Sequence, residues 1–148
     1  GLTYHPLVEI SLTPICTRSY LAEHPGLSTG DFSGCRIIKI ASDTYQWPRW
    51  QTQWGLLPEI ANELVVSTVQ SSIEAVKSNV GVAMGYLPTS YQFMRSDDDL
   101  VLPLAEKVTR HGECFLAYSN SNKDQEIIRA FHDWVAGVIA KEWSDKII

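Results

Sequence analysis

The sequence lacks any excess of positive charge and any long hydrophobic run. Lys and Arg number 12 against 17 Asp and Glu, which gives a formal net charge of −5. Because neutralised phosphates supply most nonspecific affinity for nucleic acid, an acidic chain without a basic cluster is not expected to bind a duplex directly. No apolar run reaches membrane-spanning length, and the N-terminal residues do not form a signal-peptide pattern, so neither membrane insertion nor export is predicted.

Cysteine is scarce as well. The three residues, Cys16, Cys35 and Cys114, are widely spaced and odd in number, which argues against a framework of disulfides. We therefore predict reduced, buried thiols in a cytoplasmic protein. Cys114 begins an apolar strand, where a buried and chemically inert thiol is expected.

Recognisable catalytic and metal-binding patterns are also missing. The sequence has no G-x-G-x-x-G, P-loop or G-x-S-x-G motif, and its four His and three Cys are too scattered for the paired spacing of a zinc site. His111 with Cys114, or His132 with Asp133, could support catalysis only if the fold created the necessary contacts. We predict no catalytic residue, no metal and no cofactor.

What the sequence does have is tryptophan, five in 148 residues. Trp47, Trp50 and Trp54 are spaced as one face of a helix that would run from Gln46 to Gly55. Two interpretations are open for this aromatic stripe. The commoner one is that it packs into the core, and the other is that one of the rings forms a wall of a ligand cleft.

Strand and helix patterns alternate along the chain, which predicts an α/β fold with a partly parallel sheet. The last helix has the clearest apolar period, from Lys123 to about Lys141. Pro14 is expected to bend or interrupt the first strand, and Pro58 suits the start of a helix or irregular segment over residues 57–62. The predicted strands are residues 8–12, 36–40, 63–69, 80–84, 100–102 and 114–118.

The stretch from Ser71 to Pro88 predicts a short amphipathic helix, a tight turn and a buried strand. Ser71 and Ser72 are good helix N-caps. Asn79 stands where helices commonly end in the left-handed conformation, a position that favours Gly first and Asn next. Residues 80–84 are apolar and small, as in a strand buried on both faces.

Polar residues gather between the strand at 63–69 and the helix at 71–78: Ser67, Thr68, Gln70 and Ser71. Ligands of α/β sheets collect at the carboxyl ends of strands, and the N–H groups of a helix start, with hydroxyls beside them, suit a carboxylate or another anion. The alternative is that these residues only cap the helix. Tyr86 follows the next strand and could reach the mouth of the same cleft.

Four stretches in order along the chain resemble the effector-binding domain of LysR-type transcriptional regulators, most of all the glycine-cleavage-activator branch. They correspond to that branch's "P-V-C-S-P-x-Y-L", "W-P-x-W", "G-V-A-L-G" and "F-x-x-W" segments. Arg18 stands where the family usually has Pro, and Asn79 where it usually has Gly. In this sequence the stretches are Pro14–Leu21, Trp47–Trp50, Gly81–Gly85 and Phe131–Trp134.

The resemblance implies a fold like the type 2 periplasmic binding proteins, with a mixed sheet, flanking helices and an incomplete first lobe. Residues 1–13 would end the first lobe, residues 14–112 would form the second lobe, and residues 113–148 would be the returning strand and helix of the first. The implied function is sensing of a small metabolite between two lobes. The implied ligand-binding residues border the cleft: Ser67, Thr68, Gln70, Ser71 and Tyr86.

By the same resemblance, the full-length regulator would be a dimer or tetramer and would contact DNA only through an N-terminal helix-turn-helix outside this chain. The helix at about Ser71–Ser78 would lie near a dimer contact. The effector is expected to be anionic or zwitterionic. The alternative is a solute-binding protein of the same fold without a role in transcription, and an enzyme is the third class.

Overall fold

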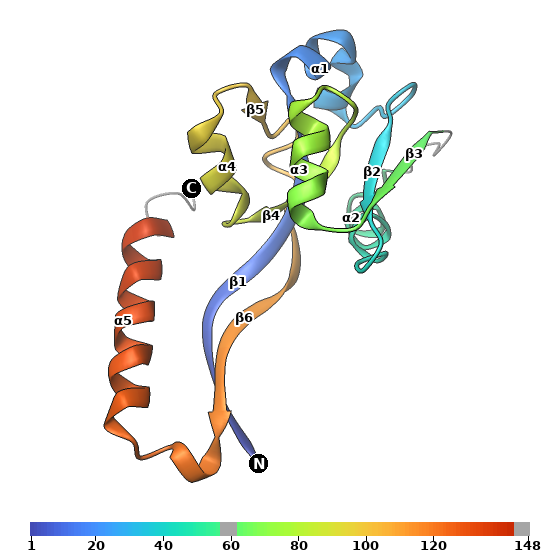
Figure 1. Ribbon diagram of the computed structural model, residues 1–148. Coiled ribbons are helices and arrows are strands. Elements are labelled where there is room, and N and C mark those ends of the chain that lie inside the picture. The colour runs from blue at the N-terminus through green and yellow to red at the C-terminus, as the bar shows by residue number, and fades with distance from the viewer. Residues whose placement is uncertain (57–61, 144–148) are drawn as a thin grey trace. The chain divides into compact units, whose positions relative to one another are not determined.

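The computed structural model describes residues 1–56 and 62–143 of the chain, which divides into two compact units (Figure 1). Unit 1 combines both ends of the chain, Gly1–Ile10 and Arg110–Ile148, and unit 2 is Ser11–Thr109. The helix or irregular segment predicted around Pro58 lies outside the described residues, apart from Asn62.

Unit 2 contains the strands of a mixed sheet and the helices that flank them, which confirms the predicted α/β class. Its described elements, in chain order, are the second half of β1 (Leu2–Thr17), α1 (Arg18–Glu23), η1 (Pro25–Thr29), β2 (Ile37–Ile40), α2 (Gln46–Trp54), β3 (Glu63–Val66), α3 (Val69–Lys77), β4 (Ala83–Leu87), α4 (Ser90–Ser96) and β5 (Leu100–Val101).

Strand pairing in unit 2 combines both orientations. β1 pairs antiparallel with β4, in register from Ser11 opposite Leu87 to Ile15 opposite Ala83, and also with β5. β2 pairs parallel with β3, and an isolated parallel bridge joins Ile37 to Val82 just before β4. The carboxyl ends of β2, β3 and β4 therefore share one direction, which positions the polar residues that follow them.

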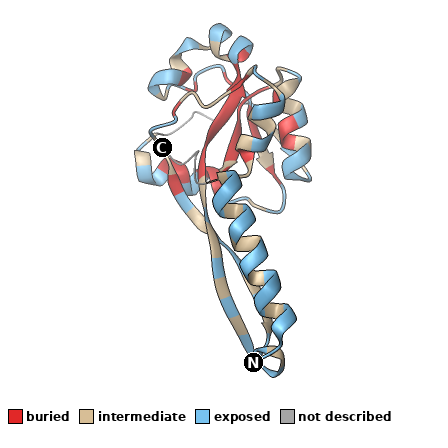
Figure 2. Cartoon of the chain, turned by 90° about the vertical axis from the view of Figure 1, so that its left-hand side faces the viewer, coloured by how far each residue is buried: buried red, intermediate tan, exposed pale blue. Residues whose placement is uncertain are grey.

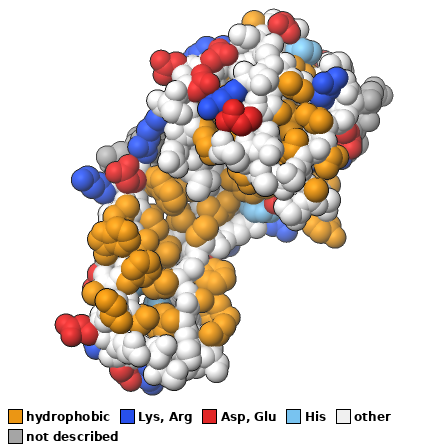
Figure 3. Space-filling view, viewed as in Figure 1, with side chains coloured by type: hydrophobic (Ala, Val, Ile, Leu, Met, Phe, Trp, Pro, Cys, Tyr) orange, Lys and Arg blue, Asp and Glu red, His pale blue; other side chains and the backbone are white. Residues whose placement is uncertain are grey.

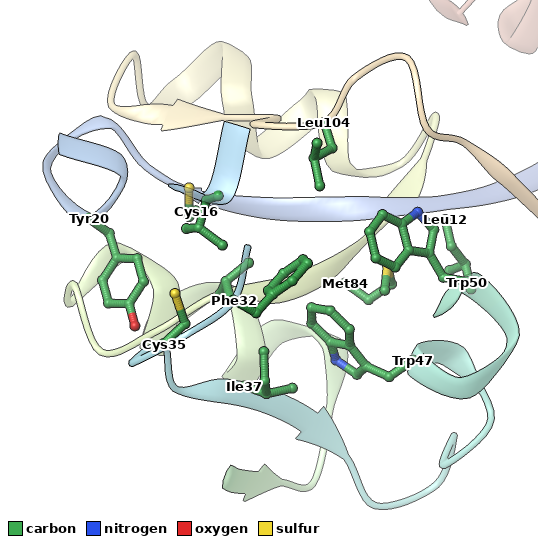
Figure 4. Close-up of a cluster of buried hydrophobic side chains, with 12 residues drawn as sticks. Leu12, Cys16, Tyr20, Phe32, Cys35, Ile37, Trp47, Trp50, Met84 and Leu104 are labelled. Atoms are coloured by element: carbon green, nitrogen blue, oxygen red, sulfur yellow. The ribbon is translucent and has the colours of Figure 1, made fainter. Parts of the chain in front are cut away.

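Unit 2 has two clusters of buried apolar side chains, one with Ile73 and Val76 of α3 and the other with two tryptophans of α2. Trp47 and Trp50 are fully buried, and each meets the Phe32 ring edge-on at a centroid distance of 5.8 Å (Figure 4). Their indole N–H groups donate to the carbonyls of Ile38 and Lys107, so neither ring leaves a buried donor unpaired. The tryptophan stripe is core packing, as the commoner interpretation predicted, and these two rings are not cleft walls.

Several strand bounds differ from those predicted: the strand expected at 63–69 is β3 and ends at Val66, and two further differences have a clear cause. β1 continues through Pro14, which lies opposite Met84 in the ladder with β4, because proline's fixed φ is compatible with extended backbone and costs only one N–H. The strand predicted at 80–84 is β4, which begins later, at Ala83. Val80 is still part of the turn after α3, since its N–H bonds back to the carbonyl of Ala75.

Unit 1 is a two-stranded ribbon with one helix. β6 (Thr109–Ser119) runs antiparallel to the first half of β1: the Asn120 N–H donates to the carbonyl of Gly1, and Arg110 pairs with Glu9. α5 (Glu126–Trp143) follows the short turn η2 (Asn120–Asn122) and starts later than the sequence predicted. Its His132 ring lies 5.0 Å from that of His5.

Burial differs sharply between the two units. In unit 2, most residues of β2, of β4 and of the second half of β1 are buried, whereas no described residue of α5 is buried (Figure 2). Cys114 on β6 is exposed, which contradicts the prediction of a buried thiol, while Cys16 and Cys35 are buried as expected. A ribbon of only two strands has too little cover to bury its side chains.

Candidate functional site

The start of α3 is organised by Thr68 rather than by Ser71 or Ser72. Thr68 is the N-cap, with extended backbone, and its Oγ1 accepts a hydrogen bond from the Ser71 N–H at 3.0 Å. The hydroxyls of Thr68 and Ser71 also lie 2.8 Å apart. The predicted N-caps, Ser71 and Ser72, therefore lie three and four residues after the observed one, because Thr68, two residues after β3, makes the turn into the helix.

This helix start has the electrostatic character that an anion site needs. No acidic residue lies in the first turn of α3, and Lys77 lies in its last turn. The first N–H groups of a helix have no intrahelical acceptor and carry its positive dipole end. With two neighbouring hydroxyls, they form a set of donors that can bind a carboxylate or phosphate.

Gln70 and Ser67 lie on either side of Thr68 in the sequence and take no part in its capping bond. The side-chain amide of Gln70 donates to Glu74 Oε1 at 2.9 Å, one turn further along α3. Gln70 is thus engaged along the helix and away from its start. Ser67 is exposed and directly follows β3, next to the cap.

Tyr86 lies near the end of β4 and contacts Asp43, a residue that sequence reasoning missed. Its hydroxyl donates to Asp43 Oδ2 at 2.6 Å, and its backbone N–H donates to Ser90 Oγ. Burial, then the hydrogen bond to Asp43 and the charge of Asp43, raise the pKa of Tyr86, so the phenol stays a protonated donor. Asp43 closes the turn that follows β2, where its N–H bonds to the carbonyl of Ile40.

These residues form two neighbouring groups at one edge of the sheet, which we call the polar edge: Asp43, Ser67, Thr68, Ser71 and Tyr86. Thr68 and Ser71 are brought into direct contact at the end of β3, and Tyr86 is joined to Asp43 at the ends of β4 and β2. Ile40 and Val66 are partners in the parallel ladder, so the two groups follow adjacent strands. Asp43 could have been found by the same rule that indicated Thr68, since it comes three residues after a buried strand.

A depression in the surface of unit 2 lies elsewhere. It has a volume of about 340 Å³ and is formed by α1, η1 and β5, with Arg18, Leu21 and Val101 among its lining residues. It shares no residue with the polar edge. Its lining residues are mostly exposed and lack the converging polar groups that mark a small-molecule site.

Alternative chemistries find little support within residues 1–56 and 62–143. That part of the chain contains no group of three or more His, Cys, Asp or Glu side chains that could hold a metal ion. His132 Nδ1 lies 3.2 Å from Asp133 on the surface of α5. None of the described helices is both long enough and apolar enough to cross a membrane.

Comparison with known families decides the affiliation. The family model described as the LysR substrate binding domain matches residues 1–140. The chain belongs to the LysR substrate binding domain family. LysR-type regulators bind small-molecule effectors and act as oligomers on DNA, and this family is a regulatory one rather than a family of enzymes. Comparison with curated proteins gives no match.

Solved structures of LysR-type effector domains share the fold. The effector domain of the transcriptional regulator AmpR of Pseudomonas aeruginosa is 20% identical with a TM-score of 0.74, over 100% of this chain and 70% of that chain. The AmpR effector binding domain from Citrobacter freundii is 18% identical with a TM-score of 0.69, over 95% of this chain and 68% of that chain. The regulatory domain of CrgA from Neisseria meningitidis is 19% identical with a TM-score of 0.67, over 93% of this chain and 69% of that chain. The LysR substrate binding domain therefore has the predicted periplasmic-binding-protein-like type 2 fold.

Proposed function

We propose that this LysR substrate binding domain senses a small anionic or zwitterionic metabolite at the polar edge of unit 2 and communicates its binding to a DNA-binding region outside this chain. Residues 14–112 act as the second lobe, and residues 1–13 and 113–148 contribute to the first. The effector changes the arrangement of lobes or subunits in a dimer or tetramer in the cytoplasm, and no catalysis takes place. The glycine-cleavage-activator branch is the part of the family that we propose for it.

The observation that carries this proposal is the pair Thr68 and Ser71 at the start of α3. Their hydroxyls and the adjacent helix N–H groups converge at the carboxyl end of a parallel strand, where α/β folds bind ligands. A carboxylate there would accept bonds from the helix N–H groups and from the hydroxyl whose proton is not used in the Thr68–Ser71 pair. Tyr86, near the end of β4, and Asp43, just after β2, border the same edge and are suited to contact the remainder of the ligand.

The test uses a protein in which this chain is joined to a complete first lobe, screened with amino acids and organic acids by thermal shift. A ligand at about 100 times its dissociation constant should raise the free energy of unfolding by about 2.7 kcal/mol, because only the folded state binds it. Thr68→Ala and Ser71→Ala should each weaken binding by about 1–3 kcal/mol, since a buried ligand group loses its partner. Gln70→Ala should have a smaller effect, because Gln70 is engaged with Glu74.

Ser96→Ala provides the matched control, because its hydroxyl bonds only to a nearby helix carbonyl, that of Phe93, on the surface. It should alter neither binding nor the ligand-induced shift. The 148-residue chain by itself should bind weakly or not at all, because a cleft between lobes needs both walls. A ligand whose affinity is unchanged in both hydroxyl variants, or a 148-residue chain that binds as tightly as the longer protein, would contradict the proposal.

The second candidate is a solute-binding protein without a role in transcription, which the periplasmic-binding-protein-like fold allows but the family match does not favour. The coding sequence upstream of this chain separates the two. A helix-turn-helix there supports the regulator, and a secretory signal supports the solute-binding protein.

A further inference from the structure

The polar edge has a second side whose chemistry is opposite to that of the α3 start. Asp43 supplies a half-buried carboxylate, and the Tyr86 hydroxyl donates to its Oδ2 at 2.6 Å. A carboxylate can accept about four hydrogen bonds, so the bond from Tyr86 orients this group without exhausting it. The α3 start therefore offers donors, whereas the Asp43 turn offers an acceptor that is both charged and oriented.

The turn that carries Asp43 contains a further acceptor. Gln46, the first residue of α2, is 1% exposed, and its side-chain N–H group donates to the Asp43 carbonyl at 3.0 Å. This bond fixes which end of the amide carries the oxygen. Within residues 1–56 and 62–143, Gln46 Oε1 has no hydrogen-bond partner. A buried carbonyl oxygen without a donor adds negative potential beside the Asp43 carboxylate, which favours a positively charged group there.

The donor side and the acceptor side lie one strand apart. β2 lies between β3 and β4, since it pairs with β3 along its length and is joined by an isolated parallel bridge to the residue before β4. The Ala41 N–H continues the pairing with β3 by donating to the Val66 carbonyl at 2.9 Å. The Asp43 turn therefore leaves the sheet beside the Thr68 cap, at about the 4.8 Å spacing of neighbouring strands. This spacing suits a molecule whose negative and positive groups are close together.

The general charge of the surface is not expected to select such a ligand. In the space-filling view, acidic and basic side chains are interspersed over unit 2 (Figure 3). Exposed charges separated by more than about 10 Å are largely screened in physiological salt. A preference for one ligand charge therefore has to come from direct contacts at the polar edge.

We propose that the effector is a zwitterion, with a carboxylate at the α3 start and a protonated amine that donates to the Asp43 carboxylate. This inference rests on the proposed function and narrows its ligand class to amino acids and other small amino-carboxylates. Asp43 is then the residue that determines specificity, and Tyr86 is a positioning residue that orients its carboxylate. A hydroxy acid of the same size lacks the charge-assisted bond, and a second carboxylate at this position is repelled.

The experiment uses the protein with a complete first lobe and compares matched ligands that differ only at the amine. Every amino acid that the thermal-shift screen detects is paired with its 2-hydroxy acid, such as alanine with lactate, and every organic acid with its 2-amino analogue. Calorimetric titration at neutral pH gives both dissociation constants. The amine should bind at least about tenfold more tightly, because its partner loses a charge-assisted contact at a half-buried carboxylate.

Three variants identify the group that reads the amine. Asp43→Asn should reduce the ratio of the two dissociation constants to about one, because the amide still accepts the bond from Tyr86 but has no charge. Tyr86→Phe should lower the ratio by only about threefold, since the carboxylate remains and loses one bond. Asp98→Asn is the matched control and should leave the ratio unchanged. It removes the same charge from an exposed position next to Arg18, at the other end of β1 from the polar edge.

The ratio is the readout because a variant that only loosened the fold would weaken both ligands of a pair equally. Hits that all lack an amine, or a ratio that Asp43→Asn leaves intact, would overturn the assignment of Asp43. An equal fall in the ratio for Asp98→Asn would overturn it too, by showing an effect of net charge rather than a contact. These results would leave the role of Thr68 and Ser71 standing. A screen without any hit, or hits that are insensitive to both hydroxyl variants, would instead contradict the proposed function and this inference together.

Discussion

The turn after α3 gives a stability prediction that can be worked through in detail. Asn79 has a φ of 59°, its N–H bonds to the carbonyl of Val76, and the Val80 N–H bonds to that of Ala75. These two bonds define a Schellman motif with Asn79 in the left-handed position. The Asn79 Oδ1 also accepts a hydrogen bond of 2.5 Å from the hydroxyl of Thr17, which is buried.

Two effects therefore act on substitution at Asn79. A β-branched side chain clashes in the left-handed conformation, which costs roughly 1–2 kcal/mol relative to Gly. Loss of the Asn79 amide leaves the Thr17 hydroxyl proton without its partner, which costs about 1–2 kcal/mol. From the sequence alone Asn79→Gly would be neutral or slightly stabilising. With the Thr17 contact, we expect it to destabilise by about 0.5–1 kcal/mol and Asn79→Val by about 2–3 kcal/mol.

Urea denaturation of the three proteins measures these differences, provided that the slope of the transition is unchanged. A double-mutant cycle with Thr17→Val isolates the side-chain contact, because Asn79→Gly should cost nothing once Thr17 has no hydroxyl to pair. If Val were tolerated as well as Gly, the left-handed turn would not be the constraint described. If the two sites showed no coupling, the hydrogen bond would contribute nothing to stability.

Two further predictions concern buried groups of unit 2. Burial raises the pKa of the Cys16 thiol from 9.0 to about 12, with smaller contributions from Cys35 and Asp99. The folded state thus favours the neutral thiol. The stability that this preference contributes is complete below pH 9 and is lost as the pH rises toward 12. Urea midpoints between pH 8 and pH 11 should fall less steeply for Cys16→Ala than for the wild type, and equal slopes would contradict the burial of this thiol. A Cβ at Gly81 would collide with the carbonyl oxygen of Arg36, so Gly81→Ala should destabilise the fold by about 1–3 kcal/mol. Gly137→Ala, at an open position of α5, should instead stabilise it by about 0.5–1 kcal/mol. Similar urea midpoints for the two variants would refute the close approach of Gly81 to Arg36.

Much of the fold of unit 2 could be predicted because its local signals agree with its tertiary contacts. The spacing of Trp47 and Trp50 predicted one helix face, and the structure buries both. Asn79 was predicted to be left-handed from its position after an amphipathic helix, and it is. In both cases a short-range pattern and the packing around it select the same conformation.

The incorrect predictions arose where a contact distant in sequence decided the outcome. Pro14 lies inside a strand because pairing with β4, some seventy positions away, outweighs the loss of one N–H. Cys114 is exposed although its strand is apolar, since exposure depends on how many layers cover a ribbon and not on the ribbon's own sequence. The same reasoning applies to α5, whose period was recognised while the exposure of half its apolar face was not.

The polar edge shows which part of a binding site a sequence can reveal. Thr68 and Ser71 are three residues apart, so their contact follows from helix geometry and could be anticipated from their spacing. Asp43 and Tyr86 are far apart in sequence, and only the parallel relation of β2 to β4 near Ile37 and Val82 brings their turns together. Such pairs depend on sheet order, which local patterns do not encode. Residues that follow buried parallel strands are therefore best considered as one set, because the sheet gathers them at a single edge whatever their distance along the chain.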